Sequence, residues 1–140
     1  MGTSRMNISQ QLALLSVINR YRTQDFKWGE YDCNTFVVEC YDAIYKKNSI
    51  QNIRNHYNSK RTALDFAKSS ISYSAWLSTK GYVKQPEGAL EKNGDIAVQP
   101  SRAWATGYMC FEGVLVGMVE KRGLAAFHFD SITNKEIWRK

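Results

Sequence analysis

A change in hydrophobic pattern near Gly94 limits what this 140-residue chain can fold into. Before that point apolar residues recur at helical spacing, and after it short apolar runs are separated by turn residues. The runs predict strands at residues 95–98, 113–119, 124–129 and 136–139. Residues 120–123 predict a hairpin turn between the second and third strands. Helices followed by an antiparallel sheet indicate the α+β class, and the chain length predicts one domain over residues 1–140.

The half of the chain before Gly94 predicts helices at residues 8–21, from Asp32 or Cys33 to Ile44, at 63–70 and at 74–79. Ser9 is the expected cap of the first helix. Asp32 is the expected cap of the second, because its carboxylate accepts hydrogen bonds from the first helical amides and its charge suits a helix N-terminus. The polar stretch at residues 48–57 is ambiguous and receives no assignment.

Cys33 is the strongest candidate for a reactive group. A nucleophilic cysteine acts as a thiolate, and the start of a helix lowers the pKa of a thiol because its unpaired N–H groups stabilise negative charge. The same N–H groups can hold an oxyanion on an acyl substrate. Cys40 and Cys110 are interpreted as packing residues, the usual role of a free cysteine. An odd cysteine count without Cys-x-x-Cys argues against a disulfide framework or a zinc knuckle.

Several short motifs together resemble a known family. They are Trp28-Gly29, then Asp32-Cys33 after two intervening residues, Gly94-Asp95, and the ending Ile137-Trp138-Arg139. These motifs resemble the NlpC-type cell-wall peptidases, which have a papain-like fold, and within that superfamily a small phage-encoded group of uncharacterised proteins. The resemblance covers most of residues 25–140. It implies N-terminal helices packed on a small C-terminal antiparallel sheet, with Cys33 in the position of the nucleophile.

The base that should activate this cysteine departs from the family pattern. A thiol hydrolase needs a group that takes the thiol proton and returns it to the leaving group. In NlpC-type enzymes this is a histidine at the start of the strand after Gly-Asp, but the corresponding run here, residues 110–117, holds none and offers Glu112. His128 matches the family's third polar residue. Either His128 approaches Cys33 directly, or Glu112 and His128 share the base and orienting roles, or His128 is a structural residue of the sheet.

The missing histidine favours a domain that keeps the scaffold without the chemistry. The resemblance then implies a structural component of a phage particle, in the tail, its tip or a connector, which is assembled in the host cytoplasm and contacts other virion proteins. One alternative is an active cysteine peptidase or amidase that cleaves peptide links in peptidoglycan. Another is a small module that binds a host factor or nucleic acid, for which the net charge of +6 is the motive.

Composition argues against several other classes. The sequence has no run of eighteen apolar residues, which predicts no membrane span, and residues 1–10 lack the apolar centre of a secretory signal. It has no glycine-rich phosphate loop and no clustered metal ligands, which predicts neither a cofactor nor a metal. Its basic residues are spread out, which argues against nucleic acid. Aromatic candidates for protein contacts, most of them expected in the core, are Trp76, Tyr82, Trp104, Tyr108 and Trp138.

Overall fold

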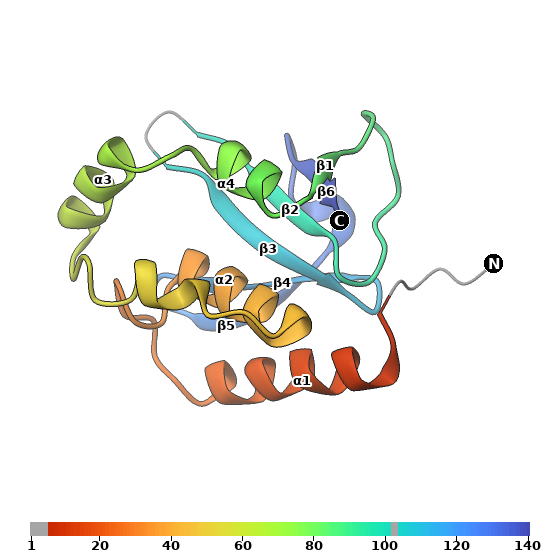
Figure 1. The fold of residues 1–140 in the computed structure, drawn as a ribbon, viewed down its shortest axis with the longest axis horizontal. Helices are drawn as coiled ribbons and strands as arrows, with labels where there is room; N and C mark the ends of the chain where they lie inside the picture. The colour runs from red at the N-terminus through yellow and green to blue at the C-terminus, as the bar shows by residue number, and fades with distance from the viewer. Residues whose placement is uncertain (1–5, 102–103) are drawn as a thin grey trace.

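The computed structural model describes residues 6–101 and 104–140, and in them helices precede strands as predicted (Figure 1). The α-helices of this part are α1 (Ile8–Arg22), α2 (Cys33–Tyr45), α3 (Lys60–Ser69) and α4 (Tyr73–Thr79). The strands are β1 (Val83–Lys84), β2 (Ile96–Gln99), β3 (Thr106–Phe111), β4 (Val114–Val119), β5 (Gly123–His128) and β6 (Glu136–Arg139). Two short 3-10 helices, η1 (Ser49–Asn52) and η2 (Phe129–Ser131), lie between α2 and α3 and between β5 and β6. The α+β class is confirmed.

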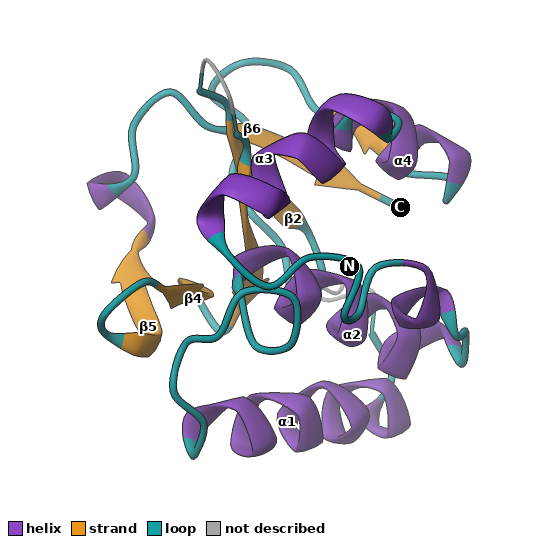
Figure 2. Cartoon of the chain, turned by 90° about the vertical axis from the view of Figure 1, so that its left-hand side faces the viewer, coloured by secondary structure: helices purple, strands orange, loops and turns teal. Residues whose placement is uncertain are grey.

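The strands form one antiparallel sheet in the order β1-β6-β2-β3-β4-β5. The last strand of the chain, β6, therefore lies between β1 and β2. The predicted hairpin turn between β4 and β5 is confirmed, and it contains Lys121 with φ 70° and ends at Gly123 with φ 82°. In Figure 2, α1 lies along the bottom, and β4 and β5 lie to the left of α2.

The strand that follows β2 is β3, and the sequence prediction missed it. Gly107 interrupts the apolar pattern of β3, and residues 107–110 are all buried, so the strand lacks the alternation typical of a half-exposed sheet. Glu112 and Gly113, with φ of 50° and 81°, form the two-residue turn that joins β3 to β4. Residues 110–117, expected to open the strand that carries the base, therefore span the end of β3, this turn and most of β4. The two-residue strand β1 was missed as well.

Helix α1 begins at residue 8 as predicted, but its N-cap lies two residues before the expected one. Asn7, not Ser9, is the N-cap: its side chain accepts from the backbone N–H of Gln10, and the Gln10 side chain accepts from the Asn7 N–H. This reciprocal pair satisfies two amides that would otherwise lack partners. Ser9 lies inside the first turn and is exposed. The sequence prediction erred because serine and asparagine are nearly equal as caps, and the reciprocal partner Gln10 was not used to choose between them.

The helical layer covers one face of the sheet. Helix α2 packs against β3 and β4, and α1 packs against α2 and β5, as Figure 1 shows with α1 along the bottom and α2 above it. The larger apolar core fills this space, with Phe36 and Met109 fully buried. On the other face a smaller core around Cys110 and Leu115 is covered by Phe129 and Ile132. Both faces of β2 and β3 are thus shielded from water.

A buried ion pair ties the last strand to the start of β2. Asp95, 2% exposed, precedes β2, and Arg139 ends β6. The guanidinium donates to both carboxylate oxygens, with Arg139 Nε 3.0 Å from Oδ1 and Nη2 2.8 Å from Oδ2. The backbone N–H of Lys92 also donates to Oδ2 at 2.9 Å. Two of the sequence motifs, Gly94-Asp95 and the ending at 137–139, therefore meet in space.

Candidate functional site

Cys33 is the first residue of helix α2, as predicted, and Asp32 is its N-cap. Asp32 Oδ1 accepts hydrogen bonds from the backbone N–H groups of Asn34 and Thr35, both at 2.9 Å, and the Thr35 hydroxyl accepts from the Asp32 N–H. This capping box fixes the start of the helix. The backbone N–H groups of Cys33 and Asn34 lower the pKa of the Cys33 thiol, but less than burial raises it.

The second carboxylate oxygen of Asp32 fixes the loop in front of the helix. Oδ2 accepts from the Gly29 N–H at 2.8 Å and from the Tyr57 hydroxyl at 2.7 Å. Gly29 has φ 84°, and a Cβ at this position would lie 1.8 Å from the Tyr57 carbonyl oxygen. The close approach of the two backbones therefore requires glycine here. The Trp-Gly-x-x-Asp-Cys motif is held by these contacts, which account for its glycine and its aspartate without invoking a reaction.

The Cys33 thiol lies in an environment that keeps it protonated. The residue is 5% exposed, and the indole Nε1 of Trp104 donates to its sulfur at 3.5 Å. Burial raises the pKa of Cys33 to about 12, and the neighbouring Asp32 carboxylate adds to that rise. The Trp104 hydrogen bond acts in the opposite direction but is weaker. An indole N–H is a donor without a basic lone pair, so Trp104 does not take a proton from the thiol.

The structure does not bring Glu112 or His128 to Cys33. Cys33 contacts Trp104, which lies just before the first residue of β3. Glu112 instead follows the last residue of β3. A six-residue strand separates its two ends by about 17 Å, so Glu112 lies far from Cys33. His128 pairs with Val114, at the same far end, and its exposed ring accepts from the Asp130 N–H. Neither of the two expected arrangements of a base is formed here.

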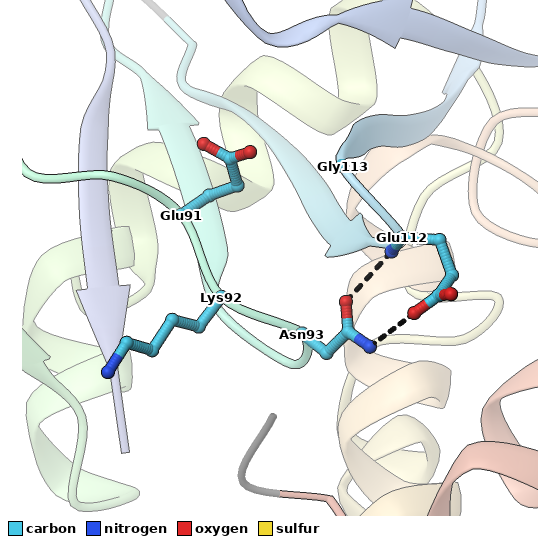
Figure 3. Close-up of a pocket in the computed structure, with 5 residues that line it drawn as sticks. All are labelled: Glu91, Lys92, Asn93, Glu112 and Gly113. Atoms are coloured by element: carbon cyan, nitrogen blue, oxygen red, sulfur yellow. Dashed lines mark hydrogen bonds between the residues drawn. The ribbon is translucent and has the colours of Figure 1, made fainter. Parts of the chain in front are cut away.

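Glu112 belongs to the surface turn between β3 and β4. Its side chain accepts from Asn93 Nδ2 at 2.6 Å, and its backbone N–H donates to Asn93 Oδ1 at 2.8 Å, as Figure 3 shows. These residues border a small pocket of about 250 Å³ that also includes Glu91, Lys92 and Gly113. Within the described residues, no three His, Cys, Asp or Glu side chains gather as metal ligands do. The expectation of no metal and no cofactor stays a prediction.

A larger pocket opens beside the cysteine. It has a volume of about 520 Å³ and lies between the start of α2, η1, α3, the start of α4 and the loop before β3. The pocket is lined by Asn34, which follows Cys33 in sequence, and by Trp104, which donates to the Cys33 sulfur. Tyr57, which bonds Asp32, lines it too. The site thus consists of a protonated thiol next to a pocket of a size typical of ligand sites.

Comparison with known proteins identifies the family of the chain. The model of a protein family described as "Domain of unknown function (DUF6950)" matches residues 6–139. The chain belongs to this family. No curated protein and no solved structure matches it. In the part of this DUF6950 protein that the structure describes, no helix has the length and apolar character needed to cross a membrane.

Sequence reasoning found Cys33 and Asp32 but missed the roles of Tyr57 and Trp104. Trp104, one of the aromatic candidates for protein contacts, donates a hydrogen bond to the thiol. No local pattern marks Tyr57, since it lies in the polar stretch that received no assignment. The expectation that most aromatic candidates are core residues is confirmed for Tyr82, Tyr108 and Trp138, which are buried. Trp76 and Trp104 are partly exposed, and both line the larger pocket.

Proposed function

We propose that this chain is a structural, non-hydrolytic component of a phage particle, built on an NlpC-like scaffold whose thiol site does not turn over. The motif resemblance suggests the scaffold, and the placement of the motifs supports it. Cys33 starts a helix that packs on an antiparallel sheet, and Gly94-Asp95 precedes the central strand β2. The phage setting and the partners, other virion proteins of the tail or its tip, follow from the resemblance to phage-encoded members.

The observation that carries the non-hydrolytic part is the environment of Cys33. In the family pattern the base is a histidine at the start of the strand after Gly-Asp, which in this fold is the start of β3. The residues there are Trp104, Ala105 and Thr106, and none of them accepts a proton near neutral pH. Burial raises the pKa of the Cys33 thiol, and its hydrogen-bond partner is an indole N–H that cannot take its proton; both features disfavour the thiolate that hydrolysis requires.

Two measurements test the proposal. Mass spectrometry of purified particles of the virus that encodes the chain should find it at a fixed copy number relative to the major tail proteins. Incubation of the purified chain with peptidoglycan should release no peptide fragments above the level of the Cys33→Ala variant, while a known wall hydrolase releases them in parallel.

The outcomes separate the alternatives. Release of fragments by the natural chain and not by Cys33→Ala identifies an active cysteine peptidase and overturns the non-hydrolytic assignment. Absence of the chain from particles removes the structural role, and a host factor or nucleic acid that co-purifies with the chain from infected cells then points to the small binding module.

A further inference from the structure

Helix α1 carries a second apolar stripe on the side that faces away from the core. Its core-facing side chains are buried: Leu14, Val17 and Tyr21. On the other side Ile8 is 75% exposed, Leu12 is 61% exposed and Leu15 is 37% exposed. Figures 1 and 2 both show α1 along the bottom edge of the molecule, with the other helices and the strands above it. A contiguous exposed apolar stripe of this kind is typical of a contact surface.

The exposed stripe has the spacing of a coiled-coil seam. Steps of four and three residues lead from Ile8 to Leu12, Leu15, Asn19 and Arg22. These five residues, called the α1 seam here, occupy the d, a, d, a and d positions of two heptads. On a helix with 3.6 residues per turn, the seam and the buried residues lie on opposite sides. The core explains only the buried side, so the seam predicts a second helix that packs along it.

Asn19 points to a second copy of this chain as the source of that helix. Its side chain is exposed and makes no hydrogen bond to another described residue. Packed against an aliphatic side chain, the amide would be buried without a hydrogen-bond partner, which is costly. In a parallel pair of identical helices Asn19 faces the same residue of the copy, and the two amides supply a donor and an acceptor to each other.

The residues that flank the α1 seam are uncharged. Ser9, Ser16 and Thr23 lie on one side of it, and Gln11 and Ile18 lie on the other. Charges at these positions select a helix of opposite charge as the partner, and here there are none to do so. A chain of net charge +6 pairs with itself only through a surface that is nearly free of charge. The α1 seam meets this condition, because its one charged residue is at its end.

The length of the seam limits the strength of the contact. The 15 residues of α1 span about 22 Å. A helix pair of this length buries less surface than the total of about 1,200 Å² that is typical of stable interfaces. The helix is already capped and packed within the domain, so the cost of forming it does not oppose the pairing. We therefore expect a weak dimer, with a dissociation constant on the order of 0.1 mM.

We propose that the α1 seam pairs with the same seam of a second copy of the chain, as two parallel helices in register about a twofold axis. Ile8, Leu12 and Leu15 then pack against their own counterparts. Asn19 bonds its counterpart and fixes the register. The contact does not include Cys33, so this inference goes beyond the proposed function and does not depend on it.

Sedimentation equilibrium of the purified full chain, from about 10 µM to 1 mM, tests the pairing. The natural chain should pass from monomer to dimer over this range. Leu12→Ser should weaken the dimer at least tenfold, because each dimer loses two buried leucine side chains. Leu90→Ser is the matched control: Leu90 is 78% exposed in the loop between β1 and β2, and its replacement should leave the dimer unchanged.

A charge exchange tests the parallel register. Leu12→Glu and Leu12→Lys should each be monomeric, because like charges would face each other across the pair. Mixing the two variants should restore a dimer, because position 12 of one chain faces position 12 of the other. Antiparallel helices that overlap along the whole seam would place it opposite Ile18 instead. Asn19→Leu should tighten the dimer about tenfold, because a polar residue at this position costs stability.

Salt and lipid distinguish a second copy from other occupants of the seam. Two chains of charge +6 repel each other, so about 0.5 M NaCl should tighten the dimer. The same salt would weaken attraction to an acidic protein or to an anionic membrane. Phosphatidylglycerol vesicles are the lipid probe, and the chain should not bind them through α1.

Four results would overturn the inference. They are a natural chain that stays monomeric at the highest concentration, a Leu12→Ser dimer as tight as the natural one, a mixture of the charged variants that stays monomeric, and vesicle binding that Leu12→Ser abolishes. Particle analysis and the peptidoglycan assay do not depend on any of them, so failure of the pairing and failure of the proposed function are distinguishable.

Discussion

Asp32 and Asp95 are buried carboxylates that each precede a secondary-structure element, but they are satisfied in opposite ways. Asp32 accepts from the backbone N–H groups of Gly29, Asn34 and Thr35 and from the Tyr57 hydroxyl, all of them neutral. Asp95 faces the guanidinium of Arg139. Among the described residues, the partners of the Asp32 carboxylate are thus neutral N–H and O–H groups, whereas the Asp95 carboxylate is paired with a cation.

This difference reaches the neighbouring thiols. Asp32 raises the pKa of Cys33 through its charge, after the larger effect of burial. Cys110 lies near the Asp95–Arg139 pair; burial is again the main cause of its raised pKa, and Arg139 counteracts the effect of Asp95. An aspartate beside a cysteine therefore does not indicate an activated thiol. Its effect depends on whether a cation accompanies it.

The largest expected effect is at Arg139. Arg139→Met leaves the Asp95 carboxylate buried without its cation and should lower the free energy of unfolding by about 3–5 kcal/mol, as measured by urea denaturation. The double variant Asp95→Asn/Arg139→Met leaves no buried charge and should be less destabilised than the single variant. Equal losses in the two variants would show that the ion pair acts by packing alone.

A smaller loss is expected at Asp32. Asp32→Ala removes a helix cap and leaves the Gly29 N–H and the Tyr57 hydroxyl without their acceptor, so the free energy of unfolding should fall by about 2–3 kcal/mol. Ser59→Ala, at the exposed cap of α3, is the matched control and should cost about 1 kcal/mol. If the two variants lose the same stability, the contacts to Gly29 and Tyr57 contribute nothing.

The pH dependence of stability sharpens the contrast for Cys33. The pKa of this thiol is raised in the folded state, so above the pKa of the unfolded chain the folded protein keeps a proton that the unfolded chain loses. The stabilising contribution of the thiol is therefore complete below the unfolded pKa and is lost as pH rises toward about 12. Between about pH 9 and 10.5, Cys33→Ser should reduce the downward slope of unfolding free energy by about 1.4 kcal/mol per pH unit. Chemical denaturation at several pH values measures this slope. An unchanged slope would mean that the Cys33 thiol titrates normally.

The smallest effects are expected at residues that contact neither Asp32 nor Asp95. His128 and Glu112 are exposed at the far end of the sheet. His128→Gln and Glu112→Gln should each change the free energy of unfolding by less than about 0.5 kcal/mol in the same urea measurement. A loss above about 1 kcal/mol from either would give that residue a structural role that its contacts do not show.

The start of α2 could be predicted because its causes are local. An aspartate followed by an apolar stripe at helical spacing specifies both the cap and the helix, and the structure places Asp32 and Cys33 accordingly. Strand β3 could not be predicted in the same way, because both of its faces are buried and glycine, here Gly107, is typical of turns. The turn at Glu112-Gly113 was the available signal for it.

The partners of the thiol could not be predicted, because they come from distant parts of the chain. Trp104 lies 71 residues from Cys33, and Tyr57 lies 25 residues from Asp32. Which side chains meet there depends on how α2 and the loop before β3 are placed by the whole sheet. Glu112 was predicted as a candidate base from its sequence position alone; the structure places it in a tight turn, where its side chain points to Asn93 at the surface.

The position of β6 has a consequence for biosynthesis. Residues 136–139 fill the gap between β1 and β2 and deliver the cation for Asp95. A nascent chain that has emerged only as far as β5 lacks the strand that pairs with both β1 and β2 and the guanidinium that faces Asp95. At elongation rates of about 5–20 residues per second, this incomplete state lasts until the final strand leaves the ribosome. The native sheet therefore closes after translation of β6, and a ribosome stalled before that strand would display an open edge to chaperones.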